Sequence, residues 1–184
     1  VLTAASLCVF VLEAQIPPLV PIPGIKLGLS NVFTLFTCAV LGLPSALAQL
    51  LIRVTLGSVI TGQLSALGYS LCGGLLSFLL LALMHKRFPA RLLWVLSAMC
   101  AVAHNLGQLI LASFIMNSSV IFWYFPALIL SGMLTGAFTG LACQLVLRDV
   151  RGLPRGRFLP WLAGLLPDPD AVVLLDVPAE EAYA

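Results

Sequence analysis

The sequence predicts an all-α integral membrane protein whose six transmembrane helices form one bundle. Hydrophobic residues make up 61% of the 184 residues, and the mean hydropathy is +1.11. Only 9% of the residues are charged, whereas soluble domains carry about 25%. The apolar residues fall into separate runs, and several runs have about the 20 residues that a helix needs to cross a bilayer.

The expected helices follow these runs, and each ends where polar, glycine or proline residues interrupt the run. Their ranges are 1–16, about 27 or 31 to 43, 45–61, 64–84, 91–116 and 120–147. The last helix is long enough to tilt, or to begin at the membrane interface with Trp123 and Tyr124. The first run is short for a span, so we expect that a few residues precede Val1. A cleaved signal peptide is the alternative, but Glu13 fits its pattern poorly.

The stretch between the first two runs, PPLVPIPGIKLGLSN at residues 17–31, does not continue a helix. Its four prolines lack N–H donors and restrict the residues before them, and Gly24 permits a sharp change of direction. Irregular backbone at membrane depth is tolerated where it is buried in protein or lines a cavity. A stiff loop that carries Lys26 between two spans is therefore typical of a lid or a pocket wall. An ordinary outside loop is the alternative.

The positive charges predict the orientation and the division into domains. The loop at 85–91 carries three basic residues, and four arginines follow the last span. With six spans both groups lie on one side, which the positive-inside rule makes cytoplasmic. Both termini are then cytoplasmic, and residues 17–31 face outside. We expect residues 1–147 to form a transmembrane substrate-binding domain and residues 148–184 a cytoplasmic tail, either interfacial or partly disordered.

Polar residues from separate stretches fall at similar depths in this topology. Glu13 lies near the outer end of the first span, Asn31 begins the second at the outer side, and Arg53 lies near mid-membrane. The fifth span adds three polar residues between its middle and its outer end. The predicted substrate-binding residues of this outward-facing zone are Glu13, Lys26, Asn31, Arg53, His104, Asn105 and Gln108.

Two of these residues have more than one interpretation. An arginine at the bilayer centre costs about 2.5–3.5 kcal/mol on insertion scales, so Arg53 must be paired or line a cavity. It either forms a buried ion pair with Glu13 or anchors an anionic or polar ligand group, and both can hold together. His104 is either a satisfied interior histidine or a ligand-binding residue. Gln108, one turn further along the same helix, extends a polar stripe with it and favours a pocket.

Small residues form a second pattern, which predicts close helix packing. Gly132, Gly136 and Gly140 recur every four residues in the sixth span, and such stripes let helix backbones approach closely. The stripe packs within the bundle or docks a partner membrane protein. Ala4 and Ala5 in the first span are a weaker version of the pattern.

The sequence lacks the residue patterns that several classes of function require. The five cysteines lie inside apolar runs without a C-x-x-C pair, and no P-loop or zinc motif is present. The close acidic pairs, which Mg²⁺ on a diphosphate requires, occur only in the tail at 168/170 and 180/181. We therefore expect no catalytic residue, metal site or cofactor, and no enzyme. The net charge of +2 also argues against nucleic acid as a partner.

Four motifs occur in order: LEAQIPPLVPIPGIKLGLSN, LLIRVTLGSVITG, AHNLGQLI and SGMLTGAFTGL. Together they resemble the Gx transporter family, which is also described as heptaprenyl diphosphate synthase component I. The family is similar to the S components of energy-coupling factor (ECF) vitamin transporters. The resemblance covers about residues 1–147 and does not include the tail.

The resemblance implies a six-helix, S-component-like fold in a bacterial cell membrane, with the first outer loop closing over a substrate. It implies a transmembrane coupling subunit and a pair of ATPases as partners. Small residues on the first span contact the coupling subunit in such proteins, and Ala4 and Ala5 match that pattern loosely. Because some relatives lie beside genes of flavin-dependent electron transfer, the resemblance also implies a flavin or quinone precursor as cargo.

The leading hypothesis is a membrane substrate-binding subunit for uptake of a small vitamin-like molecule, energised by partner subunits. The alternative is a non-transporting membrane subunit of isoprenoid or quinone synthesis that binds a lipid diphosphate at its cytoplasmic cations. A third hypothesis is a structural scaffold. An outward-facing pocket favours uptake, a groove lined by cations favours the lipid ligand, and the scaffold predicts no cavity of ligand size.

Overall fold

The computed structural model describes residues 1–15, 28–88 and 92–152, and these residues are helical apart from short connections. The helices, in chain order, are α1 (Leu2–Glu13), α2 (Asn31–Leu41), α3 (Leu43–Ile60), α4 (Leu64–Met84), α5 (Leu93–Met116), the 3-10 helix η2 (Ser119–Tyr124) and α6 (Phe125–Gly152). The all-α prediction is confirmed for this part of the chain. Lys26, most of the 17–31 loop and the tail from residue 153 lie outside the described residues.

Four segments in the described chain are long and apolar enough to cross a membrane. They are Leu43–Ile60, Ala66–Met84, Leu93–Met116 and Ser119–Leu147. Helices α1 and α2 are apolar but have only 12 and 11 residues. At 1.5 Å per residue each covers about 17 Å, roughly half of the hydrocarbon core. The molecule therefore has the helices of a membrane protein, while the count of six spans stays a prediction.

The break between α2 and α3 is a single residue. Gly42 has φ +83°, a backbone conformation that residues with a Cβ rarely adopt, and it lies between the end of α2 and the start of α3. Pro44 then occupies the first turn of α3, where its missing N–H has no helical partner to lose. The chain consequently enters α3 at once, and the short α2 packs closely against α3.

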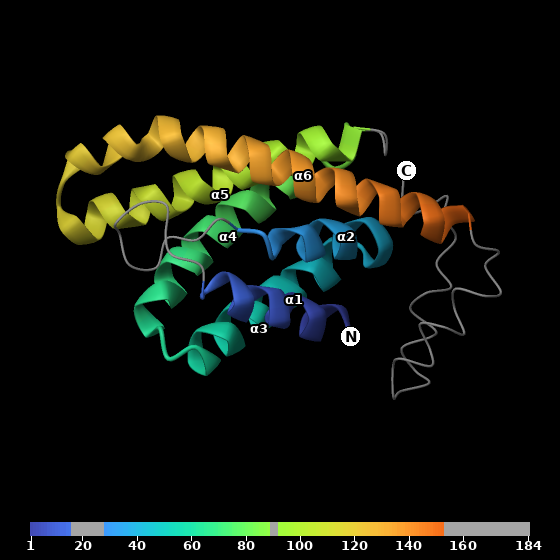
Figure 1. Ribbon diagram of the computed structural model, residues 1–184, viewed down its shortest axis with the longest axis horizontal. Helices are drawn as coiled ribbons and strands as arrows, with labels where there is room; N and C mark the ends of the chain where they lie inside the picture. Colours follow the sequence, from blue (N-terminus) through green and yellow to red (C-terminus); the bar gives the residue numbers. More distant parts are fainter. Residues whose placement is uncertain (16–27, 89–91, 153–184) are drawn as a thin grey trace.

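The helices form two groups with α2 between them. Figure 1 shows α5 and α6 side by side along the long axis and α1 with α3 on the opposite side of the molecule. Helix α4 packs on both α5 and α3, and α2 contacts α1, α3 and α6. The residues that begin α2 thus lie among helices from both groups.

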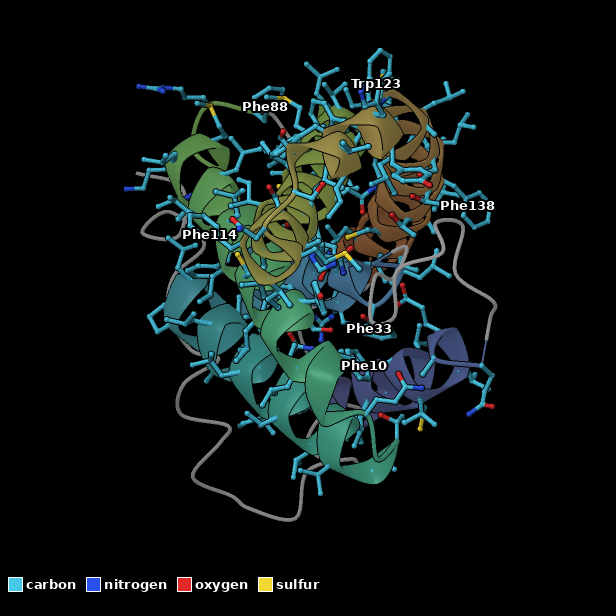
Figure 2. All side chains as sticks on the ribbon, turned by 90° about the vertical axis from the view of Figure 1, so that its left-hand side faces the viewer. Phe10, Phe33, Phe88, Phe114, Trp123 and Phe138 are labelled. Atoms are coloured by element: carbon cyan, nitrogen blue, oxygen red, sulfur yellow. The ribbon has the colours of Figure 1, made fainter. Side chains whose placement is uncertain are left out.

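Large apolar side chains cover the outside of the bundle as well as its interior. Trp123 and Phe138 are 84% and 72% exposed and lie at the periphery in Figure 2, whereas Phe10 is buried. Exposed leucines, isoleucines and valines also follow the outer faces of α3 and α4. A soluble protein rarely exposes so continuous an apolar surface, and a lipid-facing surface explains it.

The glycine stripe of α6 packs against α5. A Cβ atom on Gly136 would lie 2.6 Å from Cα of Ala98, and one on Gly140 would lie 2.5 Å from Cα of Trp94. Both distances are far below van der Waals contact, so the two helices approach as closely as glycine allows. A Cβ on Gly132 would likewise lie 2.8 Å from Nδ2 of Asn105. In α1, Ala4 is exposed and Ala5 is partly buried.

Candidate functional site

The carboxylate of Glu13, at the end of α1, accepts hydrogen bonds from the backbone that leads into α2. The N–H groups of Gly28 and Leu29 donate to Oε1, the second at 3.2 Å, while the N–H and hydroxyl of Ser30 reach Oε2, each at 3.4 Å. Glu13 is only 4% exposed. The first N–H groups of a helix lack helical partners, and a carboxylate there also interacts favourably with the helix dipole. Glu13 therefore holds the start of α2 against the end of α1.

The guanidinium group of Arg53, from the middle of α3, binds the same segment. Nη1 donates to the carbonyl oxygen of Ser30, and Nη2 donates to Oδ1 of Asn31 at 3.0 Å. Arg53 is 1% exposed and is the largest fully buried side chain of the described residues. Such burial requires partners, because a charge without them is costly in apolar surroundings.

Ser30 links the two charges through a single residue. Its N–H and hydroxyl bind Glu13, and its carbonyl oxygen binds Arg53. Within the described chain, Glu13 and Arg53 thus meet through the backbone of Ser30 instead of forming a direct ion pair. The same contacts join α1, α2 and α3 at one point.

His104 and Gln108 of α5 approach the segment from the other group of helices. Nε2 of Gln108 lies 3.0 Å from Nε2 of His104, and both side chains are buried. A Cβ atom on Gly28 would lie 3.1 Å from Cδ2 of His104, and Gly28 has φ +78°. Glycine is thus required at this position both by the backbone conformation and by the closeness of the imidazole ring.

Asn105, although adjacent to His104 in sequence, lies apart from this cluster. Its Nδ2 donates to the carbonyl oxygen of Leu128 at 2.8 Å, so the side chain joins α5 to α6. Of the seven predicted residues, the structure brings Glu13, Asn31, Arg53, His104 and Gln108 around residues 28–31, while Lys26 lies outside the described part.

A chain of buried hydrogen bonds extends the cluster through residues that sequence reasoning missed. Thr34 donates to Oε1 of Gln49 at 3.0 Å, and Nε2 of Gln49 donates to the hydroxyl of Ser6 at 2.6 Å. A signal was present in the spacing, because Gln49 precedes Arg53 by four residues and Thr34 follows Asn31 by three. Residues at these spacings share a helix face.

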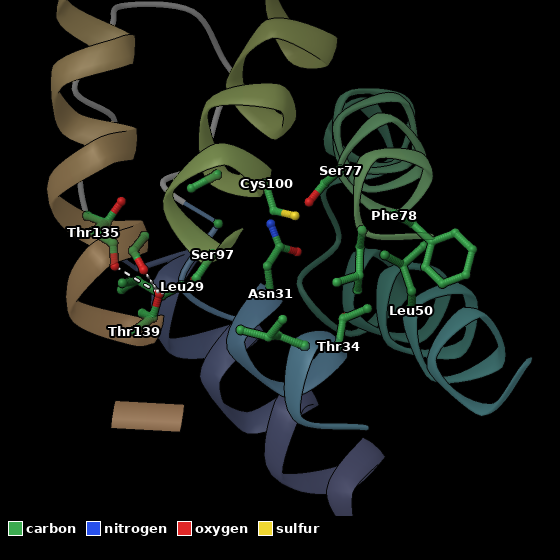
Figure 3. Close-up of a pocket in the computed structure, with 15 residues that line it drawn as sticks. Leu29, Asn31, Thr34, Leu50, Ser77, Phe78, Ser97, Cys100, Thr135 and Thr139 are labelled. Atoms are coloured by element: carbon green, nitrogen blue, oxygen red, sulfur yellow. Dashed lines mark hydrogen bonds between the residues drawn. The ribbon is translucent and has the colours of Figure 1, made fainter. Parts of the chain in front are cut away.

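A cavity of about 20 Å³ lies beside Asn31, which is room for about one water molecule. It is lined by residues of α2, α3, α4, α5 and α6, and Figure 3 shows the Asn31 side chain projecting into it. Its polar lining consists of Asn31, Thr34, Ser77, Ser97, Thr135 and Thr139. Arg53 and His104 are not part of this lining, so Asn31 alone of the predicted residues that the structure describes belongs to both the cluster and the cavity.

The described residues contain no group of three or more histidine, cysteine, aspartate or glutamate side chains that could hold a metal ion. In this part of the chain, the buried polar side chains carry amides, hydroxyls, one imidazole, one carboxylate and one guanidinium group. This donor set suits hydrogen bonding to an organic molecule better than coordination of a metal ion.

The apolar exterior and the polar core together define a helical membrane protein with buried hydrogen-bonding groups. The chain belongs to the heptaprenyl diphosphate synthase component I family, whose model matches residues 2–146. The match covers all the described helices except the end of α6. No curated protein and no solved structure matches the chain.

Proposed function

We propose that this protein is a membrane substrate-binding subunit that takes up a small, vitamin-like molecule with help from partner subunits. The observation that carries the proposal is the cluster formed by Glu13, Asn31 and Arg53, with Asn31 extending from it into a cavity of the core. The cluster lies at the entry to α2, directly after the proline-containing stretch.

The free-energy cost of burying the charged side chains of this cluster supports a functional role. Arg53 and Glu13 are almost completely buried, and ionisable residues at membrane depth usually mark a ligand or ion pathway. A bundle that served only as a scaffold would gain stability from apolar residues at these positions. The two charged side chains instead bind the short segment 28–31, and the Asn31 side chain of this segment lines the cavity.

In the described arrangement the cavity is too small for a vitamin-like molecule. A volume of about 20 Å³ holds roughly one water molecule, whereas ligand pockets occupy about 300–1,000 Å³. A vitamin-like molecule therefore binds only when α2 moves away from α4, α5 and α6, which line the other sides of the cavity. We propose that the described arrangement is the closed, unliganded state.

The proposal includes the orientation and the partners of the protein. Both termini are cytoplasmic in a bacterial cell membrane, and residues 17–31 face outside. Energy for transport comes from a transmembrane coupling subunit with ATPases, because the sequence contains no nucleotide-binding motif of its own. The protein acts without catalysing a reaction and without binding nucleic acid.

The family name favours a second candidate function. A non-transporting membrane component of prenyl diphosphate synthesis would bind a lipid diphosphate through cations at the cytoplasmic end of the bundle. Lys86 and Arg87 follow the end of α4 and are exposed. Exposed cations beside an apolar helix surface are suited to a lipid with an anionic head group.

Mass spectrometry of small molecules that co-purify with the protein tests these candidates. Extracts of the wild-type protein in mild detergent are compared with extracts of Asn31→Asp, which keeps the side-chain size and an oxygen for Arg53 but removes the amide donor. We expect a small heterocycle, such as a flavin or a quinone precursor, to be present in the wild type and depleted at least about tenfold in the variant, because a donor becomes a buried acceptor.

Asn117→Asp is the matched control, because Asn117 is exposed at the end of α5 and the chemical change is the same. It is expected to retain the molecule. A polyprenyl diphosphate in all three extracts would support the synthase component instead. A molecule that Asn31→Asp and the wild type carry equally would contradict the proposed site.

A further inference from the structure

The side-chain amide of Asn31 has only one possible orientation. Its Oδ1 accepts a hydrogen bond from Nη2 of Arg53 at 3.0 Å. A guanidinium group donates through every nitrogen and accepts none, so the oxygen of the amide must face Arg53. The Nδ2 donor consequently faces the other way, and Figure 3 shows the nitrogen directed toward Cys100 and Ser77. It is buried and has no hydrogen-bond partner among the described residues.

Three hydroxyl groups on α5 and α6 also line the cavity, and the proton of each is already donated to another oxygen. Thr135 donates to the carbonyl oxygen of Ser131 at 2.8 Å, and Thr139 donates to that of Thr135 at 2.8 Å. Ser97 lies 3.3 Å from the hydroxyl of Thr139, and because the Thr139 proton is committed, Ser97 is the donor. These three hydroxyls therefore offer oxygen lone pairs to the cavity and have no proton left to donate.

The described lining of the cavity carries no charged side chain. Arg53 does not line the cavity. Its guanidinium group instead binds Ser30 and Asn31, in the segment 28–31. An anion placed here would lose its hydration and would face the lone pairs of the hydroxyl groups, which is unfavourable. A cation would also lose its hydration without gaining a negative partner, and it would face the amide donor of Asn31.

We infer that this cavity, once α2 has moved away from the other helices, receives an uncharged polar group of the substrate, one that accepts a hydrogen bond from Asn31 and donates one to the hydroxyl oxygens of α5 and α6. A primary or secondary amide has this pattern. Arg53 acts as a positioning residue, since it fixes which end of the Asn31 amide faces the substrate. This inference rests on the proposed function and adds the chemical class of the group that is bound.

Nuclear magnetic resonance of protein labelled with ¹⁵N-asparagine tests the inference directly. The chain contains three asparagines, at positions 31, 105 and 117, and Asn31→Asp identifies the side-chain signals of Asn31 by their loss. The probes are acetamide and acetate, which have the same shape but differ in charge and in the N–H donor. We expect millimolar acetamide to shift the Asn31 side-chain signals in a saturable way and acetate to leave them unchanged.

Two threonine variants provide a matched comparison. Thr135→Val removes a hydroxyl from the cavity wall, and we expect acetamide to bind it about 3- to 10-fold more weakly. Thr55→Val is the control, because Thr55 donates to the carbonyl oxygen four residues earlier at the same 2.8 Å but is exposed on α3. It is expected to bind acetamide as the wild type does.

A separate measurement tests whether Arg53 positions the side-chain amide of Asn31. In the wild-type protein the amide protons of Asn31 are expected to give nuclear Overhauser contacts to Cys100. In Arg53→Lys these contacts are expected to weaken, because an amide that the guanidinium group no longer holds can rotate. Missing contacts to Cys100 in the wild type would overturn the orientation, whether or not Arg53→Lys folds. Equal shifts with acetate, or none with acetamide, would overturn the substrate class.

Failure of this inference is distinguishable from failure of the proposed function. If acetamide does not bind but a co-purifying molecule is lost from Asn31→Asp, the uptake function stands and the uncharged substrate group is wrong. If acetamide binds while extracts carry only a polyprenyl diphosphate, the chemistry of the cavity stands and the uptake function is wrong.

Discussion

Glu13 shows how one buried side chain can define the start of a helix. Helix α2 has no side-chain cap of its own, because Ser30 makes no capping hydrogen bond within the helix. The carboxylate of Glu13 supplies acceptors from another helix to the N–H groups of residues 28–30. A negative charge at this place also suits the positive end of the α2 dipole.

We expect Glu13→Gln to destabilise the protein by about 1.5–3 kcal/mol, because hydrogen bonds to a charged acceptor become weaker and the new NH₂ group faces backbone donors. The free energy of unfolding is measured by SDS titration of the protein in mild detergent. Gln15→Ala is the control, since Gln15 is exposed two residues later. Equal stability of Glu13→Gln and the wild type would show that the carboxylate does not hold α2.

At the scale of the elements, glycine decides how the long helices meet. Helices α4 and α5 share a close crossing, where a Cβ on Gly107 would lie 2.8 Å from the carbonyl oxygen of Cys72 and one on Gly73 would lie 2.7 Å from that of His104. The α5–α6 pair uses Gly136 and Gly140 in the same way. These contacts fix the cavity walls, because Thr135 and Thr139 flank the same glycines.

Replacing Gly136 by alanine is expected to force α6 away from Ala98 and to lower stability by about 1–3 kcal/mol, the usual cost of overpacking. Gly68→Ala is a matched control, because Gly68 lies in α4 and a Cβ there would meet only the flexible end of the Leu111 side chain, at 3.3 Å. Thermal unfolding in detergent micelles measures both. A Gly136→Ala protein that unfolds at the wild-type temperature would contradict the close packing of these helices.

For the whole molecule, the distribution of exposed apolar residues and of cations predicts its place in the membrane. Helix α5 runs from the basic end near Lys86 and Arg87 to Asn117 at the other end of the bundle. Its 24 residues cover about 36 Å, which is enough to cross the hydrocarbon core. The two ends of α5 should therefore lie on opposite sides of the bilayer.

Cysteine labelling on intact cells tests this orientation. We expect Asn117→Cys to react with a membrane-impermeant maleimide from outside, and Lys86→Cys to react only after the cells are permeabilised, because positive charges are retained in the cytoplasm. The protein without an introduced cysteine measures the background from its five native cysteines, of which Cys8 is exposed. Labelling of Lys86→Cys on intact cells would reverse the orientation.

The sequence by itself determined the helical fold class, the breaks between the helices and the presence of polar residues in the core. These follow from local composition, because apolar run length and proline or glycine breaks act within a few residues of the chain. The ends of the first five helices lie within three residues of the expected ones, taking 31 as the start of the second, whereas α6 begins and ends five residues later than expected. The 3-10 helix η2 precedes α6 where interfacial residues were expected.

Only the tertiary structure decided which polar groups meet. Whether Arg53 binds Glu13 or a backbone carbonyl depends on where α1, α2 and α3 cross, and that crossing is set by packing between residues far apart in sequence. The same is true of Asn31, whose donor faces the cavity because Arg53 holds its oxygen. Periodicity shows that a residue lies on a buried face, but the partner across that face is fixed by the packing of the other helices.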